Sequence, residues 1–441
     1  MKNITSEQLL TILQSDSKII STAINKIITD SRKAEKGALF IAIKGEKFDG
    51  HNFVGEVLDK GCELAVVEQI LPDIPADRQI AVKNTVEAYG LLGAYNRSLF
   101  KGKVIGLTGS AGKTTTKEEI KHALSVFGKT YATGGNHNNF IGVPQSLLEI
   151  DDDAAFAVIE MGMSSKGEIS KLTSYVRPDV ALVTNVYPMH IEFFENFAGI
   201  AEAKAEIFEG LHQGGTAIIN EDTNFADILE KRAYEHTDKL LKFGKNNHYN
   251  GNLELEQDGE IQCYNAWATL KVIEALGLDC DKAAASLKSF GALDGRGKKH
   301  TLPLPAGGTY TLIDDSYSGQ PEAMKIAVKS LASMPCKGRR IALLGKMAEL
   351  GDTSLAEHIA VGKLVADCKI DIVIGVKPEM KDMLAQLPAT TEQYYFDSRE
   401  GVAEFLQNKL LQKDDILLIK GARYSSELYK VTEQLLKDEP K

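Results

Sequence analysis

The residues that could do chemistry lie most densely at 104–115, in the stretch VIGLTGSAGKTT. An apolar strand is followed by a loop with two glycines, and Lys113 and Thr114 then open a helix. In such a loop, backbone N–H groups face a polyphosphate, the lysine reaches the terminal phosphates and the threonine hydroxyl holds Mg²⁺. The strict P-loop pattern would have glycine where this chain has Leu107. The stretch therefore predicts ATP or GTP binding by a close relative of the commonest P-loop, and the alternative is a plain glycine turn.

Two later strands end at groups that could join this loop. Glu160 lies at the end of the strand AAFAVIEM, and Asn185 and His190 lie at the end of the strand in VALVTNVYPMH. In an open parallel sheet, ligands gather beyond the carboxyl ends of the strands. Thr114, Glu160 and His190 could therefore meet around Mg²⁺ and the phosphates, and an imidazole ligand suggests a second ion shared with a substrate. The alternatives are a surface carboxylate at a strand end and a surface or hydrogen-bonded histidine.

The composition is typical of a globular cytoplasmic protein. The chain has 441 residues, of which 43% are hydrophobic and 25% charged, and this length predicts about three domains. A formal net charge of −10 disfavours nucleic acid or an anionic membrane as the main partner. The five scattered cysteines indicate neither a disulfide framework nor a zinc site. The first residues, MKNITSEQLLTIL, predict a capped amphipathic helix, and no stretch is long enough for membrane insertion.

The chain divides into three α/β segments. Residues 1–100 alternate the short strands ALFIAI, LAVVE and IAV with helices, and residues 101–296 contain the phosphate loop. In residues 297–441 the strands TLIDD, RIALLG, DIVIGV and ILLIKGA alternate with helices such as PEAMKIAVKSLASM. This rhythm predicts parallel sheets with crossover helices. GRGKK at 295–299 is interpreted as a glycine-rich hinge before the last segment.

Several motifs together resemble the Mur ligase family, whose members build the peptide stem of bacterial cell-wall precursors. They are TGSAGKTT, GGNHNNFIGVP at 134–144, AVIEMG at 157–162, and TNVYPMHIEFF with IAEAKAEIF at 184–208. The stretch at 27–54 resembles the UDP-sugar-binding domain shared by the two later ligases of the family. N-x-N-N-x-I-G-V-P, DDSY and MAELG favour the member that adds D-alanyl-D-alanine. The resemblance covers nearly the whole chain.

The resemblance implies a fold and a reaction. Residues 1–100 would be an N-terminal UDP-sugar-peptide-binding α/β domain, 101–296 a central P-loop ATPase-like parallel sheet, and 297–441 a C-terminal Rossmann-like ligase domain. The implied activity is ATP-dependent ligation of D-alanyl-D-alanine to UDP-N-acetylmuramoyl-tripeptide through an acyl phosphate, with release of ADP and phosphate. Phosphate is a good leaving group, whereas the oxide of a free carboxylate is not. The expected protein is a monomer that uses ATP and Mg²⁺.

The resemblance also assigns roles to individual residues. Lys113, Glu160, His190 and Lys204 would be catalytic, and Thr114, Glu160, His190 and a carbamate on Lys204 would hold metal. From the residues alone, Lys204 in IAEAKAEIF is interpreted as an ordinary solvated helix lysine. The remaining assignments are ATP binding by Thr108, Gly109, Ser110, Ala111, Gly112, Lys113, Thr114, Asn265, Arg296 and Asp315, and substrate binding by Ser31, Arg32, Asn136, Asn138, Asn139, Lys420 and Arg423.

The chain departs from the family pattern at a few positions. Ser318 and Gln320 stand where asparagines are usual, Lys346 replaces an acidic residue, and Ala422 replaces a serine. These differences concern contacts to the amine substrate and leave the phosphate and metal residues unchanged. The rival hypotheses are a ligase that adds the third stem residue, a folylpolyglutamate-type enzyme, and a nucleotide-binding homologue that has lost catalysis. The sequence leaves open whether diaminopimelate or lysine is the third stem residue.

Overall fold

The computed structural model is an α/β protein, as predicted. The described residues are 3–45, 48–189, 191–256, 259–305 and 307–437. The chain folds as two compact units, of which the first comprises Met1–Val186, Ala201–Glu254 and Tyr264–Leu287, and the second Tyr187–Ile200, Leu255–Cys263 and Lys288–Lys441. Parallel sheets form the interior of both units.

The first unit contains a small N-terminal sheet. Its strands are parallel in the order β3 (Lys26–Ile28), β4 (Ala38–Ile41), β5 (Leu64–Val67) and β6 (Gln79–Ala81). Leu39 of β4 packs with the helices α1 (Ser6–Leu13) and α3 (Thr85–Leu99), while the adjacent Phe40 packs with α2 (Val54–Asp59). Both faces are covered, which is why these strands are continuous apolar runs. The Thr5 side chain caps α1 in a capping box, which confirms the predicted capped helix, and β1 (Ile4–Thr5) pairs with β2 (Ala23–Ile24).

The central sheet of the first unit has six parallel strands in the order β12-β11-β10-β7-β9-β8. The strand β7 lies between β9 and β10 and is parallel to both, so the carboxyl ends of these three strands meet at one edge. This is the arrangement that the sequence predicted for the phosphate loop, Glu160 and Asn185. The strands are Lys103–Thr108 (β7), Thr130–Ala132 (β8), Phe156–Glu160 (β9), Val180–Val183 (β10), Thr216–Asn220 (β11) and Leu240–Phe243 (β12). The helices are Lys113–Ser125 (α4), Gly142–Leu148 (α5), Glu168–Val176 (α6), Phe197–Ala205 (α7), Ala226–Tyr234 (α8), Glu260–Ala275 (α9) and Cys280–Leu287 (α10).

The second unit is built on another six-stranded sheet, in the order β13-β14-β18-β15-β16-β17. The four strands that the sequence predicted here, β14, β15, β16 and β18, pair in parallel as expected, and β13, which was not predicted, adds an antiparallel edge strand beside β14. Lys298 and Lys299 of GRGKK begin β13, which limits the glycine turn to 295–297. The strands are Lys298–Pro303 (β13), Thr309–Asp315 (β14), Arg340–Gly345 (β15), Ile372–Val376 (β16), Glu392–Phe396 (β17) and Ile416–Lys420 (β18).

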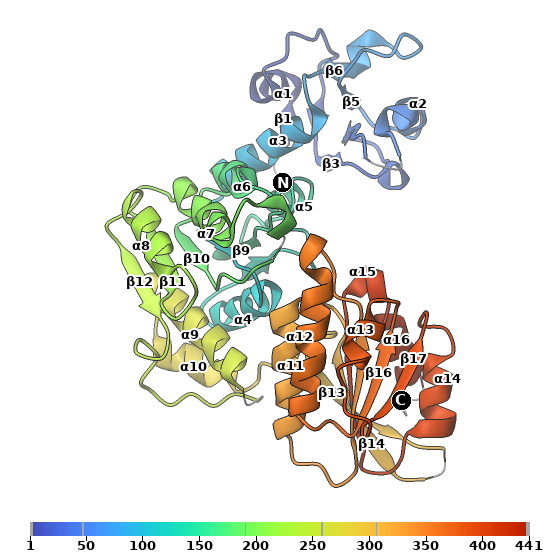
Figure 1. Ribbon diagram of the computed structural model, residues 1–441. Helices are drawn as coiled ribbons and strands as arrows, with labels where there is room; N and C mark the ends of the chain where they lie inside the picture. The colour runs from blue at the N-terminus through green and yellow to red at the C-terminus, as the bar shows by residue number, and fades with distance from the viewer. Residues whose placement is uncertain (1–2, 46–47, 190, 257–258, 306, 438–441) are drawn as a thin grey trace. The chain divides into compact units, whose positions relative to one another are not determined.

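Helices cover both faces of this second sheet. Leu343 packs with α14 (Val402–Phe405), the π-helical turn Leu406–Leu410 and α16 (Tyr429–Leu436), whereas Leu344 packs with α11, α12 and α13. The alternation follows from the two-residue period of a strand. In Figure 1 the two groups lie on opposite sides of the strands. The other helices are Pro321–Ser333 (α11), Ser354–Asp367 (α12), Met380–Leu384 (α13) and Arg423–Ser426 (α15).

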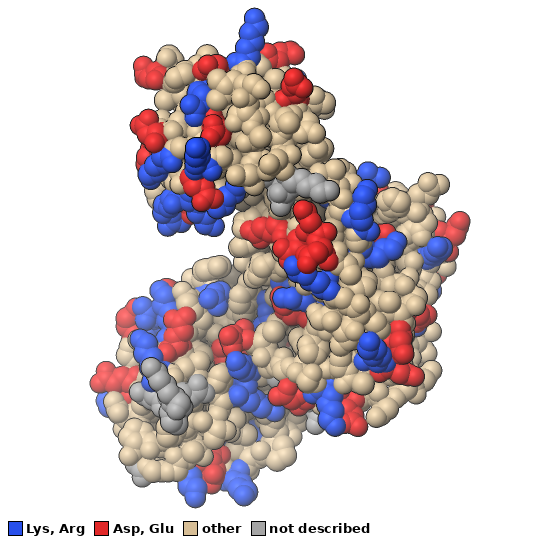
Figure 2. Space-filling view, turned by 180° about the vertical axis from the view of Figure 1, so that it is seen from behind, with Lys and Arg blue, Asp and Glu red and all other residues tan. Residues whose placement is uncertain are grey.

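The surface carries charges of both signs. Figure 2 shows Lys and Arg interspersed with Asp and Glu on the face in view. In the described part of the chain, no helix has both the length and the apolar character that crossing a bilayer requires.

A buried acid on α4 makes stability depend on pH. Glu119 is 4% exposed, its Oε1 has no hydrogen-bond partner in the described part of the chain, and burial raises its pKa to about 8. In an unfolded chain a glutamate titrates near pH 4.3, so between these two values the folded state binds more protons. The free energy of unfolding contributed by this group is therefore highest below about pH 4.3 and falls as the pH rises to about 8.

Glu119→Gln is expected to remove this dependence, because the amide stays neutral. Relative to the wild type, the variant should gain a few kcal/mol in free energy of unfolding at pH 8 and much less at pH 5. Each pH unit between the unfolded-state and folded-state pKa values lowers the free energy of unfolding of the wild type by about 1.4 kcal/mol. Urea unfolding of both proteins from pH 5 to pH 9 measures the difference. A difference that is the same at pH 5 and pH 8 would contradict the prediction.

Candidate functional site

The phosphate loop has the backbone that its glycines predicted. A Cβ on Gly109 would lie 1.9 Å from Oγ1 of Thr184, so only glycine fits there. Gly112 has a φ of +77° at the N-terminus of α4, a conformation that favours glycine. The Lys113 Nζ donates to the carbonyl of Gly109 at 2.8 Å. The result is a helix N-terminus preceded by a tight loop, which is a ready site for a polyphosphate.

The end of β10 holds this loop from one side. The Asn185 side chain accepts from the Ala111 N–H at 2.8 Å and donates to the Ala111 carbonyl at 3.0 Å. The Thr184 hydroxyl donates to the same carbonyl at 3.0 Å, and the Ser110 N–H donates to the backbone of Asn185. The sequence placed Asn185 at a strand end, and the structure gives it a role in fixing the loop.

Asn265 of α9 lies against the start of α4. It is buried, its Oδ1 accepts from the Thr116 hydroxyl at 3.1 Å, and it lies 3.2 Å from the position of a Cβ on Gly112. Tyr264 and Trp267, which flank Asn265 in the sequence, have ring centres 5.0 Å apart. The contact of Asn265 with adenine stays a prediction.

Glu160 lies buried at the end of β9. It is 1% exposed, so the interpretation as a surface carboxylate is wrong. Its Oε1 accepts from the Asn138 amide at 2.8 Å, while its Oε2 is buried and has no hydrogen-bond partner among the described residues. A buried carboxylate oxygen with unused capacity suits a cation. In the described ranges, no three His, Cys, Asp or Glu side chains form a metal-binding group, and His190 lies outside the described residues.

The asparagines of the loop after β8 have different roles. Asn138 contacts Glu160, as described. The Asn139 Oδ1 accepts from the N–H groups of Ile141 and Gly142 at 3.1 and 2.9 Å, which satisfies backbone donors where α5 begins. The carbonyl of Asn136 accepts from the Asn138 N–H at 2.7 Å. The proposed substrate contacts of all three stay predictions.

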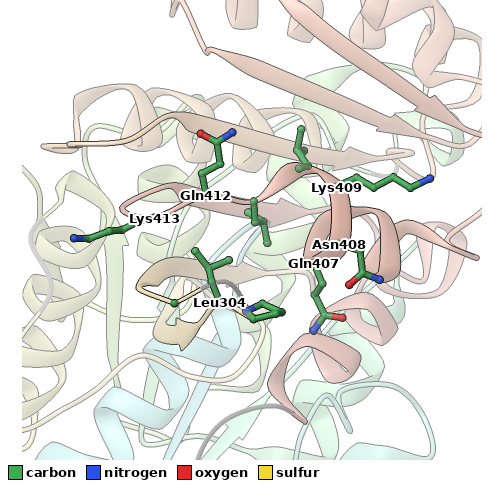
Figure 3. A pocket seen from close by; sticks show the side chains of 10 residues that line it. Leu304, Gln407, Asn408, Lys409, Gln412 and Lys413 are labelled. Atoms are coloured by element: carbon green, nitrogen blue, oxygen red, sulfur yellow. The ribbon is translucent and has the colours of Figure 1, made fainter.

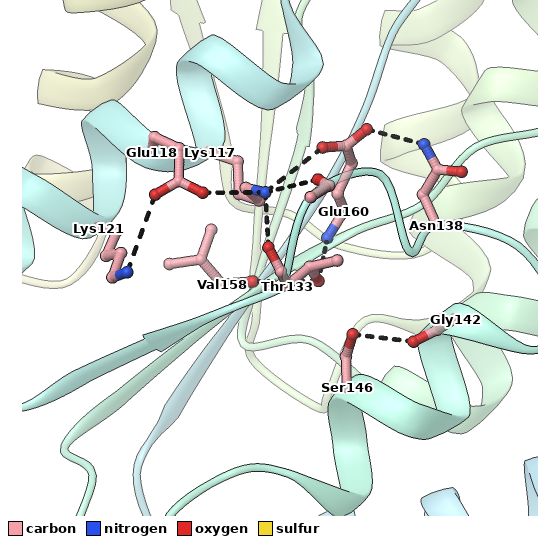
Figure 4. A network of polar contacts seen from close by, with 10 residues as sticks. Lys117, Glu118, Lys121, Thr133, Asn138, Gly142, Ser146, Val158 and Glu160 are labelled. Atoms are coloured by element: carbon pink, nitrogen blue, oxygen red, sulfur yellow. Dashed lines mark hydrogen bonds and ion pairs between the residues drawn. The ribbon is translucent and has the colours of Figure 1, made fainter. Parts of the chain in front are cut away.

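Lys117 of α4 belongs to this site and was missed by the sequence analysis. Its side chain is fully buried, and its Nζ lies 4.0 Å from Oε2 of Glu160 (Figure 4). The sequence carries one signal for it. Lys117 shares helical spacing with the buried Ile120 and Leu124, so it occupies an apolar-face position of α4.

Lys204 lies near the C-terminal end of α7 and is only 3% exposed. Burial, together with the charge of Lys113, holds the pKa of Lys204 well below its ordinary value. No hydrogen bond or ion pair reaches its ammonium from the part of the chain that the structure describes. The interpretation as a solvated helix lysine is therefore wrong, and its modification stays a prediction.

In the second unit, two predicted residues meet at the carboxyl ends of adjacent strands. Asp315 of β14 is opposite Lys420 of β18, and their side chains form an ion pair at 2.7 Å. The Lys420 ammonium also donates to the Ser318 carbonyl at 2.9 Å. Burial raises the pKa of Asp315, and Lys420 partly opposes this shift.

Two arginines lie over aromatic rings near the same strand ends. The Arg296 guanidinium is 4.2 Å from the ring centre of Tyr317, and that of Arg423 is 5.3 Å from Tyr317 and 4.3 Å from Tyr429. The structure thus brings four predicted residues of the second unit together through Tyr317 and the Asp315–Lys420 pair.

The unusual Lys346 follows β15 and forms an ion pair with Glu379 at 2.5 Å. The cation that replaces an acidic residue is therefore compensated within the same unit.

In the first unit, Ser31 and Arg32 lie in the short 3₁₀ turn Ser31–Lys33 after β3. The Arg32 side chain is 87% exposed and pairs with Asp30 at 2.7 Å. The hydrogen bond from Arg32 lowers the pKa of Asp30 to about 2.

A cavity of about 460 Å³ lies elsewhere in the second unit (Figure 3). Leu304 and the stretch 407–413 line it, next to the amino ends of β14 and β18. The predicted residues Asp315 and Lys420 are at the opposite ends of these strands, so the cavity is separate from the candidate site.

Three family models match the chain. They are described as "Mur ligase family, catalytic domain" over residues 23–94, "Mur ligase middle domain" over 107–275 and "Mur ligase, glutamate ligase domain" over 304–423. Each range falls inside one of the three predicted domains, whose bounds stay predictions.

Individual relatives match over almost the full length. The UDP-N-acetylmuramoyl-tripeptide–D-alanyl-D-alanine ligase of Escherichia coli is 34% identical, with 96% of each chain covered. The crystal structure of MurF from Acinetobacter baumannii superposes with a TM-score of 0.89 at 31% identity, covering 99% of both chains. MurF from Thermotoga maritima in complex with ADP gives a TM-score of 0.80 at 27% identity, covering 94% of this chain and 97% of the other.

Proposed function

The chain belongs to the Mur ligase family, and we propose that it joins D-alanyl-D-alanine to UDP-N-acetylmuramoyl-tripeptide at the expense of ATP. The observation that carries the proposal is the gathering of a phosphate loop, the buried Glu160 and the buried Lys204 in a chain similar over its full length to ligases with this name. The products are ADP, phosphate and the completed stem peptide. The relative solved with ADP supports the use of a nucleotide.

The proposed reaction has two steps. A terminal carboxylate oxygen of the UDP-linked peptide attacks the γ-phosphorus of ATP, and the bond from that phosphorus to ADP breaks. The amine of D-alanyl-D-alanine then attacks the acyl carbon, phosphate leaves, and the nitrogen loses a proton. The N–H groups at the start of α4 and the Lys113 ammonium bind and orient the phosphates. These groups therefore lie where negative charge is concentrated during phosphoryl transfer.

We infer that Mg²⁺ accompanies ATP. The free Oε2 of Glu160 and the hydroxyl of Thr114, the residue after Lys113, are oxygen ligands of the kind that Mg²⁺ prefers. By the family resemblance, Thr114 and Glu160 would hold one ion, and Glu160 and His190 would hold a second ion that a carbamate on Lys204 supports. When bound, the ion neutralises charge on the phosphates.

The environment of Lys204 favours carbamate formation. The reaction needs the neutral amine, whose nitrogen adds to the carbon of CO₂ and then loses a proton. Burial lowers the pKa of Lys204, which increases the neutral fraction at neutral pH. The product is an anion where the structure has a buried lysine with no acidic partner among the described residues.

The strand ends of the second unit are suited to the other reactants. Arg296 and Asp315 are proposed to contact the nucleotide, and Lys420 and Arg423 the substrates. Arg423, which lies over the rings of Tyr317 and Tyr429, presents a planar and permanently charged donor. A carboxylate such as that of D-alanyl-D-alanine fits this donor.

Phosphate release tests the function directly. With ATP, Mg²⁺ and UDP-N-acetylmuramoyl-tripeptide present, sustained release should require D-alanyl-D-alanine. Release that requires a single amino acid, with the UDP-linked dipeptide as acceptor, would identify the ligase that adds the third stem residue. ATP binding without turnover on any stem peptide would identify a homologue that has lost catalysis. Running the assay with lysine-containing and diaminopimelate-containing tripeptides identifies the third residue.

We also propose that the protein is a cytoplasmic monomer. Cell fractionation and light scattering of the purified protein test these two properties.

Arg32→Ala is expected to raise the Michaelis constant for the UDP-linked peptide about tenfold, with less effect on that for ATP, because a charge-assisted hydrogen bond contributes about 1.5–3 kcal/mol. The exposed guanidinium suits a diphosphate, which would compete with Asp30 for it. Steady-state kinetics with each substrate varied in turn measures the effect.

Lys33→Ala is the matched control, because Lys33 is the exposed neighbour in the same turn. Equal increases in both Michaelis constants of Arg32→Ala would place Arg32 outside the UDP site.

A further inference from the structure

The Lys117 ammonium lies at the junction of three segments of the phosphate site. It donates to the carbonyls of Thr133 and Gly135 at 2.5 and 3.0 Å. Both residues lie in the segment after β8 that leads to the loop of Asn136, Asn138 and Asn139, here called the asparagine loop. It forms an ion pair with Glu118 of its own helix at 3.0 Å and faces Glu160 of β9 at 4.0 Å. Figure 4 shows these contacts converging on one nitrogen.

Burying this ammonium is unfavourable unless its partners compensate. Moving a charged group out of water costs several kcal/mol, and the attraction of well-placed acceptors must offset it. Lys117 is fully buried, and among the described residues its ammonium has four polar contacts, each to a carbonyl or carboxylate oxygen. The geometry of the three segments is therefore tied to one side chain.

The two oxygens of Glu160 are held differently. Asn138, which lies in the asparagine loop, donates to Oε1 at 2.8 Å. Oε2 faces Lys117 at 4.0 Å, which is too long for a hydrogen bond, so this oxygen is oriented by charge and keeps its capacity for a ligand. Lys117 thus acts on Glu160 directly and, through the carbonyls that it binds, on the loop that carries Asn138.

We propose that Lys117 is a positioning residue, which sets the asparagine loop and the free oxygen of Glu160 relative to the phosphate loop, ready for the cation that accompanies the nucleotide. The inference rests on the proposed function in that it assumes a nucleotide–cation complex as the ligand. It assigns Lys117 no contact with the substrates.

The test compares Lys117→Met with Lys121→Met. Lys121 is on the same helix, is 44% exposed and lies 3.8 Å from Oε2 of Glu118, so it controls for loss of one α4 lysine. Lys117→Gln keeps a hydrogen-bond donor for the carbonyls but removes the charge. For each folded variant, hydrogen exchange follows the amides of residues 133–142 without ligand. Calorimetry measures the binding of a non-hydrolysable ATP analogue with and without Mg²⁺.

In Lys117→Met, the increase in affinity for the ATP analogue that Mg²⁺ causes is expected to be about tenfold smaller. Amide hydrogen exchange in the asparagine loop is expected to be about tenfold faster. Both sizes correspond to the loss of one charge-assisted hydrogen bond. Affinity for the metal-free analogue should change less than about twofold, because the phosphate-loop amides remain. Lys117→Gln should recover loop protection without recovering the Mg²⁺ response. Lys121→Met should match the wild type in both measurements.

A folded Lys117→Met protein with wild-type loop exchange and a wild-type Mg²⁺ response would overturn the inference. If Lys117→Met does not fold, Lys117→Gln decides, and an unchanged Mg²⁺ response in that variant overturns it. The proposed function is tested separately, by phosphate release from the wild type. A wild type that binds Mg²⁺ and the analogue but does not ligate would refute the function and leave the binding test of Lys117 intact.

Discussion

Turnover is expected to fall by about 10²- to 10³-fold on Lys113→Ala, the range for loss of a key electrostatic group at a transferring phosphoryl group. The change removes the ammonium that lies 2.8 Å from the Gly109 carbonyl and leaves the glycine geometry of the loop in place. The remaining N–H groups at the start of α4 should still bind nucleotide, so the loss should appear mainly in kcat. Phosphate release at saturating substrates measures it.

Lys121→Ala is the control for this variant, because Lys121 lies on the same helix with an exposed side chain. It should keep wild-type turnover. Near-wild-type ligation by a folded Lys113→Ala protein would contradict the assignment of this loop as the ATP phosphate site.

The features that the sequence predicted correctly are those set by local pattern. The strand β15 has the bounds of RIALLG, and α11 begins at Pro321, where proline suits the first helical turn. The strand, loop and helix around Lys113 follow from an apolar run and two glycines in special positions. The position of Glu160, at the end of the strand beside the one that leads into the phosphate loop, follows from one rule about parallel strands.

The features that the sequence could not predict depend on contacts between distant segments. Lys204 has no local feature that distinguishes it from an exposed helix lysine, and its burial is decided by the elements packed around α7. Lys117 is buried because carbonyls from another segment receive its ammonium. Asn139 belongs to a motif that predicted substrate contact, yet its side chain also serves the start of α5. Burial of a polar group is a tertiary property, and no local rule supplies it.

The candidate site contains three lysines, Lys113, Lys117 and Lys204, and the buried carboxylate of Glu160. Lys113 contacts the loop backbone, Lys117 has acidic partners, and Lys204 has none among the described residues. Burial, together with the nearby charge of Lys113, disfavours an unmodified, charged Lys204, and both lower its pKa. Carbamate formation would turn this lysine into an anion that complements Lys113 and a divalent cation. Modification of Lys204 would thus reverse the sign of one charge in the site.

Lys204→Ala is therefore expected to be nearly inactive, with a loss of about 10²-fold or more, because an anion that supports the cation would be missing while the acyl phosphate forms. Wild-type activity should depend on dissolved CO₂, falling in CO₂-depleted buffer and returning on addition of bicarbonate. Mass spectrometry of the wild type, with the carbamate trapped by alkylation, should locate the modification at Lys204.

Short carboxylic acids separate a catalytic role from a structural one. Formate or acetate should partly restore the activity of Lys204→Ala by occupying the vacated space as an anion, whereas Lys204→Glu should recover little because its side chain is shorter than a carbamylated lysine. Lys231→Ala, at an exposed position of α8, should keep full activity with or without these acids. An exposed helix lysine changed to alanine alters stability by at most about 0.5 kcal/mol and leaves the rate unchanged. Full activity of Lys204→Ala at ordinary Mg²⁺ would place Lys204 with such lysines and remove the carbamate from the mechanism.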